Sequence, residues 1–438
     1  MNPGTKRRRY PLSYCQEWIW LLQQLQPGCL AYHVPFAFCI EGDVNPWILE
    51  KALHLLVRRH DLLRTGLTMV DDRPAQRTSA RARLALQRAD LEDVHPLDRG
   101  AVLDAGLQAE LREPFDLAHP PLARARLFRL ERGTHVLSLI LHHLVADAWS
   151  ARVCLRDLLA FYRHLRDGIP LALEPLPMQY AAYVEEQRTD QYRGLIDRDI
   201  AYWRQELQHA PPPGLTFDRP AAPNGADRAG QLQWTLPSDL IGRMRAVAAQ
   251  THTTLFMTVL AAWYLALRQR SGCDDLVVGV VVADRARVDV EPLIGCFINV
   301  LPVRIRTAGE RSSAGLLATV RRIALSAYTH MHVPFMSLVR ALAPPRGAHQ
   351  QTYFDSIVNW LPDVPAAFAG GLRMSARSVR AVDTDVPITL YVEPHGATLD
   401  LRLLYRTDLL LPATAADCLR GFRDALDTVV ASDSGELP

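Results

Sequence analysis

The chain has 438 residues, of which 49% are hydrophobic, and its charged groups nearly balance at a net charge of +2. This length suits two ordinary domains or one large unit with two lobes. The balanced charge gives no reason to expect nucleic acid as a partner, and no run of eighteen apolar residues occurs that would span a membrane.

The cysteines and the N-terminus indicate the compartment. Seven cysteines are scattered along the chain, odd in number and without a CxxC pair. This pattern favours reduced thiols in a cytoplasm and argues against a disulfide framework or a structural zinc site. The N-terminus carries a basic run at 6–9 but no apolar segment behind it of the kind that a signal peptide requires. We therefore expect a cytoplasmic protein.

The first third of the chain alternates helices and strands. Apolar residues at helical spacing predict a helix over 13–25, and an apolar run predicts a strand over 34–40. Asn45 and Pro46 supply a cap and a first-turn proline for a helix that ends at Arg59. Further along, the apolar runs 122–130 and 135–142 predict a hairpin, and a helix over 149–165 follows it.

The rest of the chain predicts a second lobe. Prolines and a glycine over 167–177 mark the best domain boundary, because proline breaks both element types. Ser238 is expected to cap a helix, and an apolar helix over 254–270 is expected to end at Gly272. A strand over 276–283 and a late hairpin over 388–405 complete the pattern. We expect α/β lobes over 1–170 and 171–438.

The stretch 142–150 carries the chemistry. His142 and His143 end the predicted strand, and Asp147 follows just before a helix. Neighbouring strand residues point to opposite faces, so the two imidazoles are poorly placed to bind one metal ion. One imidazole should face a cleft, where a group that titrates near neutrality suits a general base or a hydrogen-bond donor. The residues alone leave a satisfied polar corner open as the alternative.

The pattern HHxxxDxxS at 142–150 resembles the signature of the condensation domains of nonribosomal peptide synthetases and of their chloramphenicol-acetyltransferase-like relatives. The resemblance covers nearly the whole chain. PLSYCQEW at 11–18 is similar to the family's S-x-A-Q-x-x-x-W, with Tyr14 and Cys15 as departures, and RHDLLRT at 59–65 is similar to R-H-E-x-L-R-T. IGCFINVLPVR at 294–304 is similar to I-G-x-F-V-N-T-L-x-x-R. Each motif alone is weak, but their order and spacing identify the chain as a member of this family.

The resemblance implies an α/β fold of two chloramphenicol-acetyltransferase-like lobes that form a V-shaped pseudo-dimer with a central tunnel. It implies that His143 faces the tunnel, where it orients or deprotonates the attacking amine or stabilises charge on the tetrahedral intermediate. His142 would point into the fold, and Asp147 would form a structural ion pair with Arg285. The segment 281–304 would help to close the tunnel, and the late hairpin would cross back over the first lobe.

Four more positions are implied to line the tunnel: Ala148, Trp149, Ser150 and Asn299, although a packing role for Asn299 is equally expected. The family usually has glycine where Ala148 stands, and glycine would allow a positive φ or a close approach of substrate to the backbone. Heterocyclising relatives carry D-x-x-x-x-D in place of the histidine motif, so ring formation is disfavoured.

The kind of condensation domain stays open among three alternatives. Because the family motifs begin at Pro11, we favour a starter domain that transfers a fatty acyl group from acyl-CoA to an aminoacyl thioester on a peptidyl-carrier protein, beside adjoining synthetase domains. The second alternative is a free-standing or in-trans enzyme that takes its donor from an acyl-carrier protein and releases an amide or ester. The third is a non-catalytic docking domain. We expect no metal and no covalently bound cofactor, only phosphopantetheine-borne substrates. The basic run at 6–9 suits CoA phosphates or an acidic carrier, though most such runs are only solvated.

Overall fold

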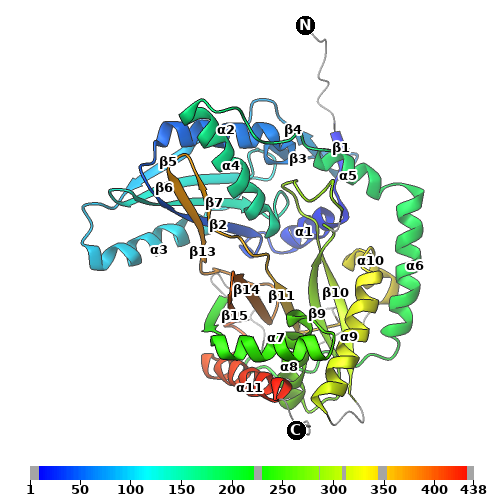
Figure 1. Ribbon diagram of the computed structural model, residues 1–438. Coiled ribbons are helices and arrows are strands. Elements are labelled where there is room, and N and C mark those ends of the chain that lie inside the picture. The colour runs from blue at the N-terminus through cyan, green and yellow to red at the C-terminus, as the bar shows by residue number, and fades with distance from the viewer. Residues whose placement is uncertain (1–8, 221–228, 286, 308–311, 344–352, 432–438) are drawn as a thin grey trace. The chain divides into compact units, whose positions relative to one another are not determined.

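The computed structural model describes residues 9–220, 229–285, 287–307, 312–343 and 353–431. The chain divides into two compact units, and both are discontinuous in sequence (Figure 1). The first unit comprises Met1–Tyr192, Arg285–Phe297 and Pro362–Val382. The second comprises Arg193–Asp284, Ile298–Leu361 and Asp383–Pro438.

The first unit is built on a six-stranded sheet in the order β12-β13-β2-β7-β6-β5, with a smaller sheet β1-β4-β3 beside it. All neighbours in the larger sheet are antiparallel except β5 and β6. The strands are β1 (Arg9–Pro11), β2 (His33–Glu41), β3 (Thr65–Val70), β4 (Arg73–Thr78), β5 (Leu86–Asp90), β6 (Ala123–Glu131), β7 (Thr134–His142), β12 (Ala367–Ala369) and β13 (Leu372–Arg377).

Helices cover both faces of the larger sheet. Figure 1 shows α2 and α4 side by side on one face and α3 on the other. Leucines of α3 pack with Phe128, Val136 and Ile140 of β6 and β7 in a buried apolar cluster, and this burial of apolar surface is the main stabilising term of the layer. The helices of this unit are α1 (Tyr14–Leu25), α2 (Pro46–Arg59), the 3₁₀ turn η1 (Asp61–Arg64), α3 (Pro96–Arg112), α4 (Trp149–Asp167) and α5 (Tyr180–Gln187).

Side-chain caps begin two helices of the first unit, and the one at Asn45 was predicted. Ser13 accepts a hydrogen bond from the backbone of Gln16, whose side chain accepts one from the backbone N–H of Ser13, so the two residues form a capping box for α1. Asn45 accepts from the backbone N–H groups of Trp47 and Ile48 at the start of α2. The predicted hairpin is also confirmed, as β6 and β7.

The second unit has its own six-stranded sheet, in the order β10-β9-β11-β14-β15-β8. Helix α8 is buried along most of its length, starts at the cap Thr254, and ends at Gly272 with a φ of 70°, as predicted. The elements are α6 (Asp190–Glu206), β8 (Ala229–Thr235), α7 (Ser238–Gln250), α8 (Leu255–Ser271), β9 (Asp275–Ala283), β10 (Ile298–Arg306), α9 (Ser313–Thr329), α10 (Phe335–Leu342), β11 (Ser356–Trp360), β14 (Ile388–His395), β15 (Thr398–Arg406) and α11 (Pro412–Val430).

Two sequence predictions are wrong. Ser238 is the first residue of α7 and makes no capping hydrogen bond, because Pro237 occupies the cap position. The late hairpin, β14–β15, does not cross to the first unit, since its outer neighbours are β11 and β8 of the second. The strand that joins the first sheet is β13, which pairs antiparallel with the open edge of β2.

The division into units also falls elsewhere than the expected boundary at residue 170. Residues 171–192 belong to the first unit. The side chain of Gln179 accepts from the backbone N–H of Asp61 and donates to the carbonyl of Arg59, so hydrogen bonds fix the chain to the end of α2 just before α5. The prolines within 167–177 therefore mark a loop of the first unit and not its end.

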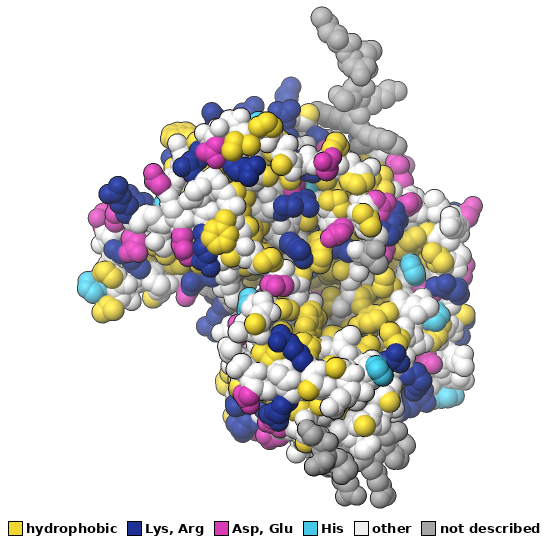
Figure 2. All heavy atoms as spheres, viewed as in Figure 1, with side chains coloured by type: hydrophobic (Ala, Val, Ile, Leu, Met, Phe, Trp, Pro, Cys, Tyr) yellow, Lys and Arg dark blue, Asp and Glu magenta, His cyan; other side chains and the backbone are white. Residues whose placement is uncertain are grey.

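Positive and negative side chains are mixed on the face of the molecule that Figure 2 shows. On the face in Figure 2, basic and acidic side chains are interspersed among apolar ones, as the net charge of +2 predicts. Among the residues that the structure describes, no helix is both long enough and apolar enough to cross a membrane.

Candidate active site

The two histidines of the motif lie where β7 ends. The backbone N–H of His142 donates to the carbonyl of Leu122 at 3.0 Å, and that of His143 donates to the carbonyl of Tyr32 at 2.8 Å. These bonds fix the backbone of both residues. The His142 side chain is 1% exposed, whereas His143 is half-buried, so the pleat of the strand separates the two imidazoles.

His142 is a neutral core residue. Its Nδ1 accepts a hydrogen bond from the backbone N–H of Leu144 at 3.1 Å. Its ring meets those of His33 and Phe115 edge-on, with centroids 6.1 and 5.9 Å away. Burial holds the pKa of His142 well below its usual value. His142 therefore supports the turn and carries no charge at neutral pH.

Asp147 and Arg285 are brought together by the fold. Arg285 donates from Nε to Oδ2 at 3.0 Å and from Nη2 to Oδ1 at 2.9 Å, and both side chains are almost fully buried. Oδ1 also accepts from the backbone N–H and the hydroxyl of Ser150, and Oδ2 accepts from the backbone N–H of Phe297. All of these residues belong to the first unit. The carboxylate is thus fully engaged in holding structure.

Arg285 also organises the rest of the segment 285–297, which we call the floor segment. Its Nη1 donates to the carbonyls of Val290 and Leu293, at 3.1 and 2.9 Å. Its guanidinium lies 4.1 Å from the centre of the Phe297 ring. A single buried cation thereby fixes both ends of the floor segment and joins it to the turn that carries His143.

Close packing fixes the end of the floor segment. A Cβ on Gly295 would lie 2.6 Å from the rings of both Phe297 and Tyr180, so only glycine fits. The Tyr180 hydroxyl donates to the carbonyl of Cys296 at 2.6 Å and lies 2.8 Å from the hydroxyl of Ser13. Tyr180 therefore joins the start of α5 to the floor segment and to the cap of α1.

Two residues that the sequence analysis did not single out hold the site from behind. Gln16 donates to the carbonyl of Leu144 at 2.8 Å, just after the histidines. His60 lies 2.8 Å from Asp157 through Nε2, and its Nδ1 accepts from the backbone N–H of Ile294. Both lie in motifs on which the family resemblance rests. Their position in those motifs is the sequence signal that could have identified them as residues of the site.

The cysteines correct an expectation. Cys15 and Cys296 form a disulfide, whereas we expected reduced thiols throughout. Cys15 lies in the first turn of helix α1 and Cys296 lies in the floor segment, 281 residues later. No local spacing signals a pairing over such a separation, which is why the sequence did not show it. The other five cysteines are not part of a disulfide.

The four expected substrate positions have different surroundings. Ala148 has φ −61° and ψ −32°, so its backbone conformation does not require glycine. Trp149 is half-buried and donates from Nε1 to the carbonyl of Glu291. Ser150 is fully buried in the contacts of Asp147. Asn299 lies in the second unit, where its side chain donates to the carbonyls of Met331 and Val333, at 3.0 and 2.7 Å.

A groove in the first unit lies beside this turn. Its volume is about 450 Å³, and it runs along one face of α4, from Trp149 to Arg163, against the residues 364–369 that lead into and form β12. The lining is mainly apolar, but Arg152, Arg156 and Arg163 add positive charge. The guanidinium of Arg152 lies 5.2 Å from the centre of the Trp149 ring. This combination suits a ligand with an apolar body and an anionic group.

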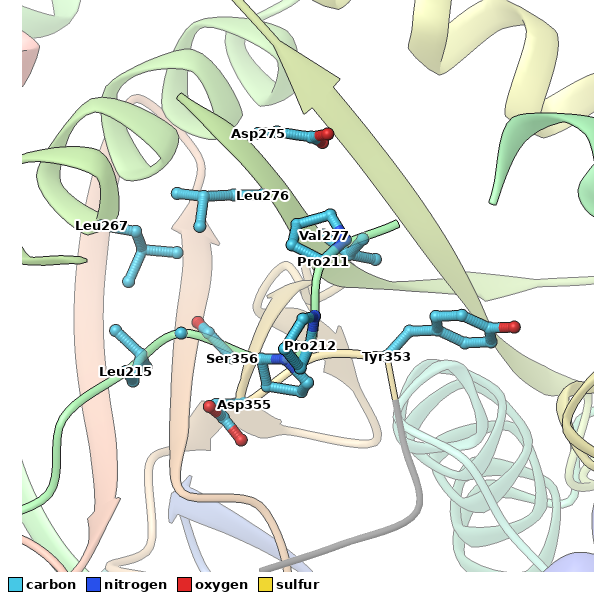
Figure 3. A pocket seen from close by; sticks show the side chains of 12 residues that line it. Pro211, Pro212, Leu215, Leu267, Asp275, Leu276, Val277, Tyr353, Asp355 and Ser356 are labelled. Carbon is cyan, nitrogen blue, oxygen red and sulfur yellow. The ribbon is translucent and has the colours of Figure 1, made fainter. Parts of the chain in front are cut away.

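The second unit contains a much smaller cavity, of about 20 Å³ (Figure 3). Prolines 211–213, Tyr353 and Asp355 line it. Burial raises the pKa of Asp355 to about 6. The cavity has room for a water molecule but not for a substrate.

Within the described ranges, no cluster of three or more histidine, cysteine or acidic side chains is arranged to hold a metal ion.

Comparison with known proteins decides the family. The family described as Condensation domain matches residues 6–436. The chain belongs to the condensation-domain family. Condensation domains form amide bonds in nonribosomal peptide synthesis, so the expectation of an amide-forming acyltransferase is confirmed at that level.

The curated relatives are much longer. A linear gramicidin synthase polypeptide of Brevibacillus parabrevis is 33% identical to this condensation domain over 418 residues, which are 94% of this chain and 5% of the synthase. The chain thus spans about a twentieth of that relative.

Solved structures confirm the fold of two chloramphenicol-acetyltransferase-like α/β lobes. SgcC5 of Streptomyces globisporus has a TM-score of 0.86 and 26% identity, and the match covers 97% of this chain and 100% of that one. The X-domain of teicoplanin biosynthesis, solved in complex with OxyB, has a TM-score of 0.82 and 26% identity over 99% of this chain and 96% of that one.

Proposed function

We propose that this condensation domain transfers an acyl group from a thioester donor to the amine of an aminoacyl thioester on a carrier protein, with His143 as its catalytic residue. One observation carries the proposal: the two histidines of the motif differ in burial. His142 is buried and neutral, while His143 is half-buried and its backbone N–H donates to the carbonyl of Tyr32. A partly exposed imidazole beside a rigid turn is suited to proton transfer.

The reaction needs little beyond positioning and one proton carrier. The amine attacks the thioester carbonyl, a C–N bond forms, the C–S bond breaks, and the thiol leaves with a proton. His143 either accepts the amine proton or donates a hydrogen bond to the charge that develops on the intermediate. Asp147 takes no part in proton transfer, because Arg285, Ser150 and Phe297 occupy its carboxylate. Holding two activated partners together supplies much of the rate.

Fatty acyl-CoA is the donor that we favour. The groove along α4 supports this choice, because Arg152 and Arg163 suit phosphate groups and the apolar lining suits a pantetheine arm. In the starter role, the product is an acylated aminoacyl thioester on a peptidyl-carrier protein, within a larger synthetase. The alternative donor is an acyl-carrier protein that acts in trans, and release of an amide or ester would then follow.

Intact-mass analysis of an amino-acid-loaded carrier protein tests the reaction. The carrier is incubated with this chain and either a panel of acyl-CoAs or an acyl-loaded carrier. An acyl mass gain from CoA that disappears in His143→Ala supports the starter function and gives the preferred chain length. A gain from the acyl-loaded carrier alone moves the donor to a carrier protein. His330→Ala, a change at a histidine of the second unit, is the matched control and should keep the activity.

A docking domain is the second candidate. The similarity to an X-domain that was solved in complex with OxyB favours it. Binding of a carrier protein without turnover from any donor, in a folded chain, would support this function over catalysis.

A further inference from the structure

Helix α1 contributes a buried amide to the turn that carries His143. The amide belongs to Gln16, whose Nε2 donates to the carbonyl of Leu144 at 2.8 Å across 128 residues of sequence. Leu144 directly follows His143, and its backbone N–H donates to Nδ1 of His142 at 3.1 Å. Both polar groups of the Leu144 backbone are therefore bound, the N–H within the motif and the carbonyl by α1.

The amide of Gln16 is itself held in one orientation. Its Oε1 accepts from the backbone N–H of Ser13 at 2.9 Å, and its Nε2 also donates to Oε1 of Gln76 at 3.1 Å. Gln76 is buried and donates from Nε2 to the carbonyl of Pro11 at 2.9 Å. Both N–H donors and the oxygen of the Gln16 amide thus have partners, and only this orientation places a donor toward Leu144.

The cap of α1 also reaches the floor segment. The hydroxyl of Tyr180 lies 2.8 Å from that of Ser13 and donates to the carbonyl of Cys296 at 2.6 Å. The Sγ atom of Cys296 lies 3.9 Å from Nδ1 of His143. The capping box Ser13–Gln16 is therefore connected to the backbone on two sides of the imidazole, and Gln16 makes the direct contact with the turn.

We propose that Gln16 is a positioning residue that places the imidazole of His143 for the reaction through the carbonyl of Leu144; the inference rests on the proposed function. The carbonyl belongs to a buried residue, so loss of its donor leaves it unsatisfied. The peptide group after Leu144 then turns toward another donor, and the backbone of His143 moves with it. A displacement of about 1 Å lowers a rate by about 100-fold, because proton transfer needs hydrogen-bond distance.

The chain offers a matched pair of variants. Gln16 and Gln76 are both buried amides of one network, but Gln76 contacts Gln16 and Pro11 rather than the turn. Gln16→Leu and Gln76→Leu each remove an amide and leave a backbone carbonyl without its donor. In Gln16→Leu, kcat should fall by about 10–100-fold while KM for the loaded carrier changes by less than about twofold. In Gln76→Leu, kcat should stay within about twofold of the unmodified chain.

A purely structural role predicts a different result. The two variants would then lose stability and activity together and to the same extent. Circular dichroism and thermal unfolding establish which fraction of each variant is folded at the assay temperature, and kcat is expressed per folded chain. An unchanged kcat in Gln16→Leu, or equal losses in both variants, would overturn the proposal.

Gln16→Glu provides a second test with nearly the same side-chain shape. The introduced carboxyl still accepts from the N–H of Ser13, and burial raises its pKa. When protonated, it donates to the carbonyl of Leu144, whereas the ionised form has no proton to donate. Its kcat relative to the unmodified chain should therefore fall by about tenfold or more as the pH rises from about 6 to about 9, and recover when the pH is lowered. A ratio that does not change with pH would overturn the proposal.

The placement of His143 is also measured without substrate. The full chain is labelled with ¹³C-histidine, and the ring C–H resonance of His143 is assigned by NMR from the spectrum of His143→Gln. Gln16→Leu should shift this resonance, and Gln76→Leu should leave it in place. An unshifted resonance in Gln16→Leu would overturn the proposal. Absence of product from the unmodified chain would contradict the proposed function, while the resonance would still decide whether Gln16 places the imidazole.

Discussion

Asp147 follows His143 by four residues, yet its carboxylate faces Arg285, at 2.9 and 3.0 Å from Nη2 and Nε. The guanidinium in turn holds the carbonyls of Val290 and Leu293. The motif thus combines a half-buried imidazole with an acid that fixes the floor segment. Loss of activity in an Asp147 variant would report a displaced structure and not a lost proton carrier.

Asp147→Ala should therefore destabilise the fold. The change leaves Arg285 buried without its counter-charge, and breaking such a pair costs about 3–5 kcal/mol. Urea denaturation measures the loss in the free energy of unfolding. The double variant Asp147→Leu with Arg285→Met removes both charges and should recover much of this loss. A single variant as stable as the unmodified chain would contradict the structural role.

Substitution of His143 should affect mainly activity, whereas substitution of His142 should affect mainly stability. His143→Ala is expected to lower the rate of amide formation by about 10²-fold or more, the size of a general acid–base contribution, with little change in unfolding. His142→Ala removes a buried ring that packs against His33 and Phe115, and should cost about 2–4 kcal/mol of stability. Activity and melting temperature, measured on both variants, test the assignment. A reversed pattern would exchange the two roles.

The sequence predicted the structural features that depend on residues close together in the chain. The cap at Asn45 and the end of α8 at Gly272 follow from residue chemistry within a few positions, and both are confirmed. The strand β13 was missed although LRMSAR alternates apolar and polar residues, because six residues give only a weak strand signal and the open edge of β2 sets its place.

The same distinction between local features and features set by tertiary packing applies to the candidate site. The family motifs drew attention to His143, Asp147 and Arg285 before the structure was known. They did not show that Cys15 and Cys296 meet, because tertiary packing over 281 residues decides that contact. Nor did they show that Ala148 adopts an ordinary helical conformation, since φ depends on the turn and not on the residue alone.

Asp355 should make stability depend on pH. Burial raises its folded-state pKa from 3.8 to about 6, so the folded chain binds more protons than the unfolded chain between these values. Stability from this group is therefore lost as the pH rises from about 4 to about 6. Asp355→Asn keeps an acceptor for the backbone N–H of Leu215 and removes the charge. Its stability should equal that of the unmodified chain near pH 4 and exceed it by roughly 2–3 kcal/mol above pH 6.

Denaturant unfolding across this pH range measures the difference between the two chains. The other titratable groups contribute equally to the free energy of unfolding in both chains, so their contributions cancel in the difference. An advantage of Asp355→Asn that does not change with pH would contradict the raised pKa of Asp355.

The arginines of the groove should affect donor binding more than chemistry. Arg152→Ala with Arg163→Ala removes two positive charges beside the apolar lining of the groove. If acyl-CoA phosphates bind there, KM for acyl-CoA should rise by about tenfold while kcat changes little, because ground-state and transition-state binding are lost together. The effect should weaken at high salt, where phosphate contacts are screened.

Arg245→Ala, a change at an exposed arginine of the second unit, is the matched control and should leave KM unchanged. Equal KM values for the double variant and the control would place the donor's phosphates elsewhere, and loss of kcat alone would indicate that these arginines position the reacting groups.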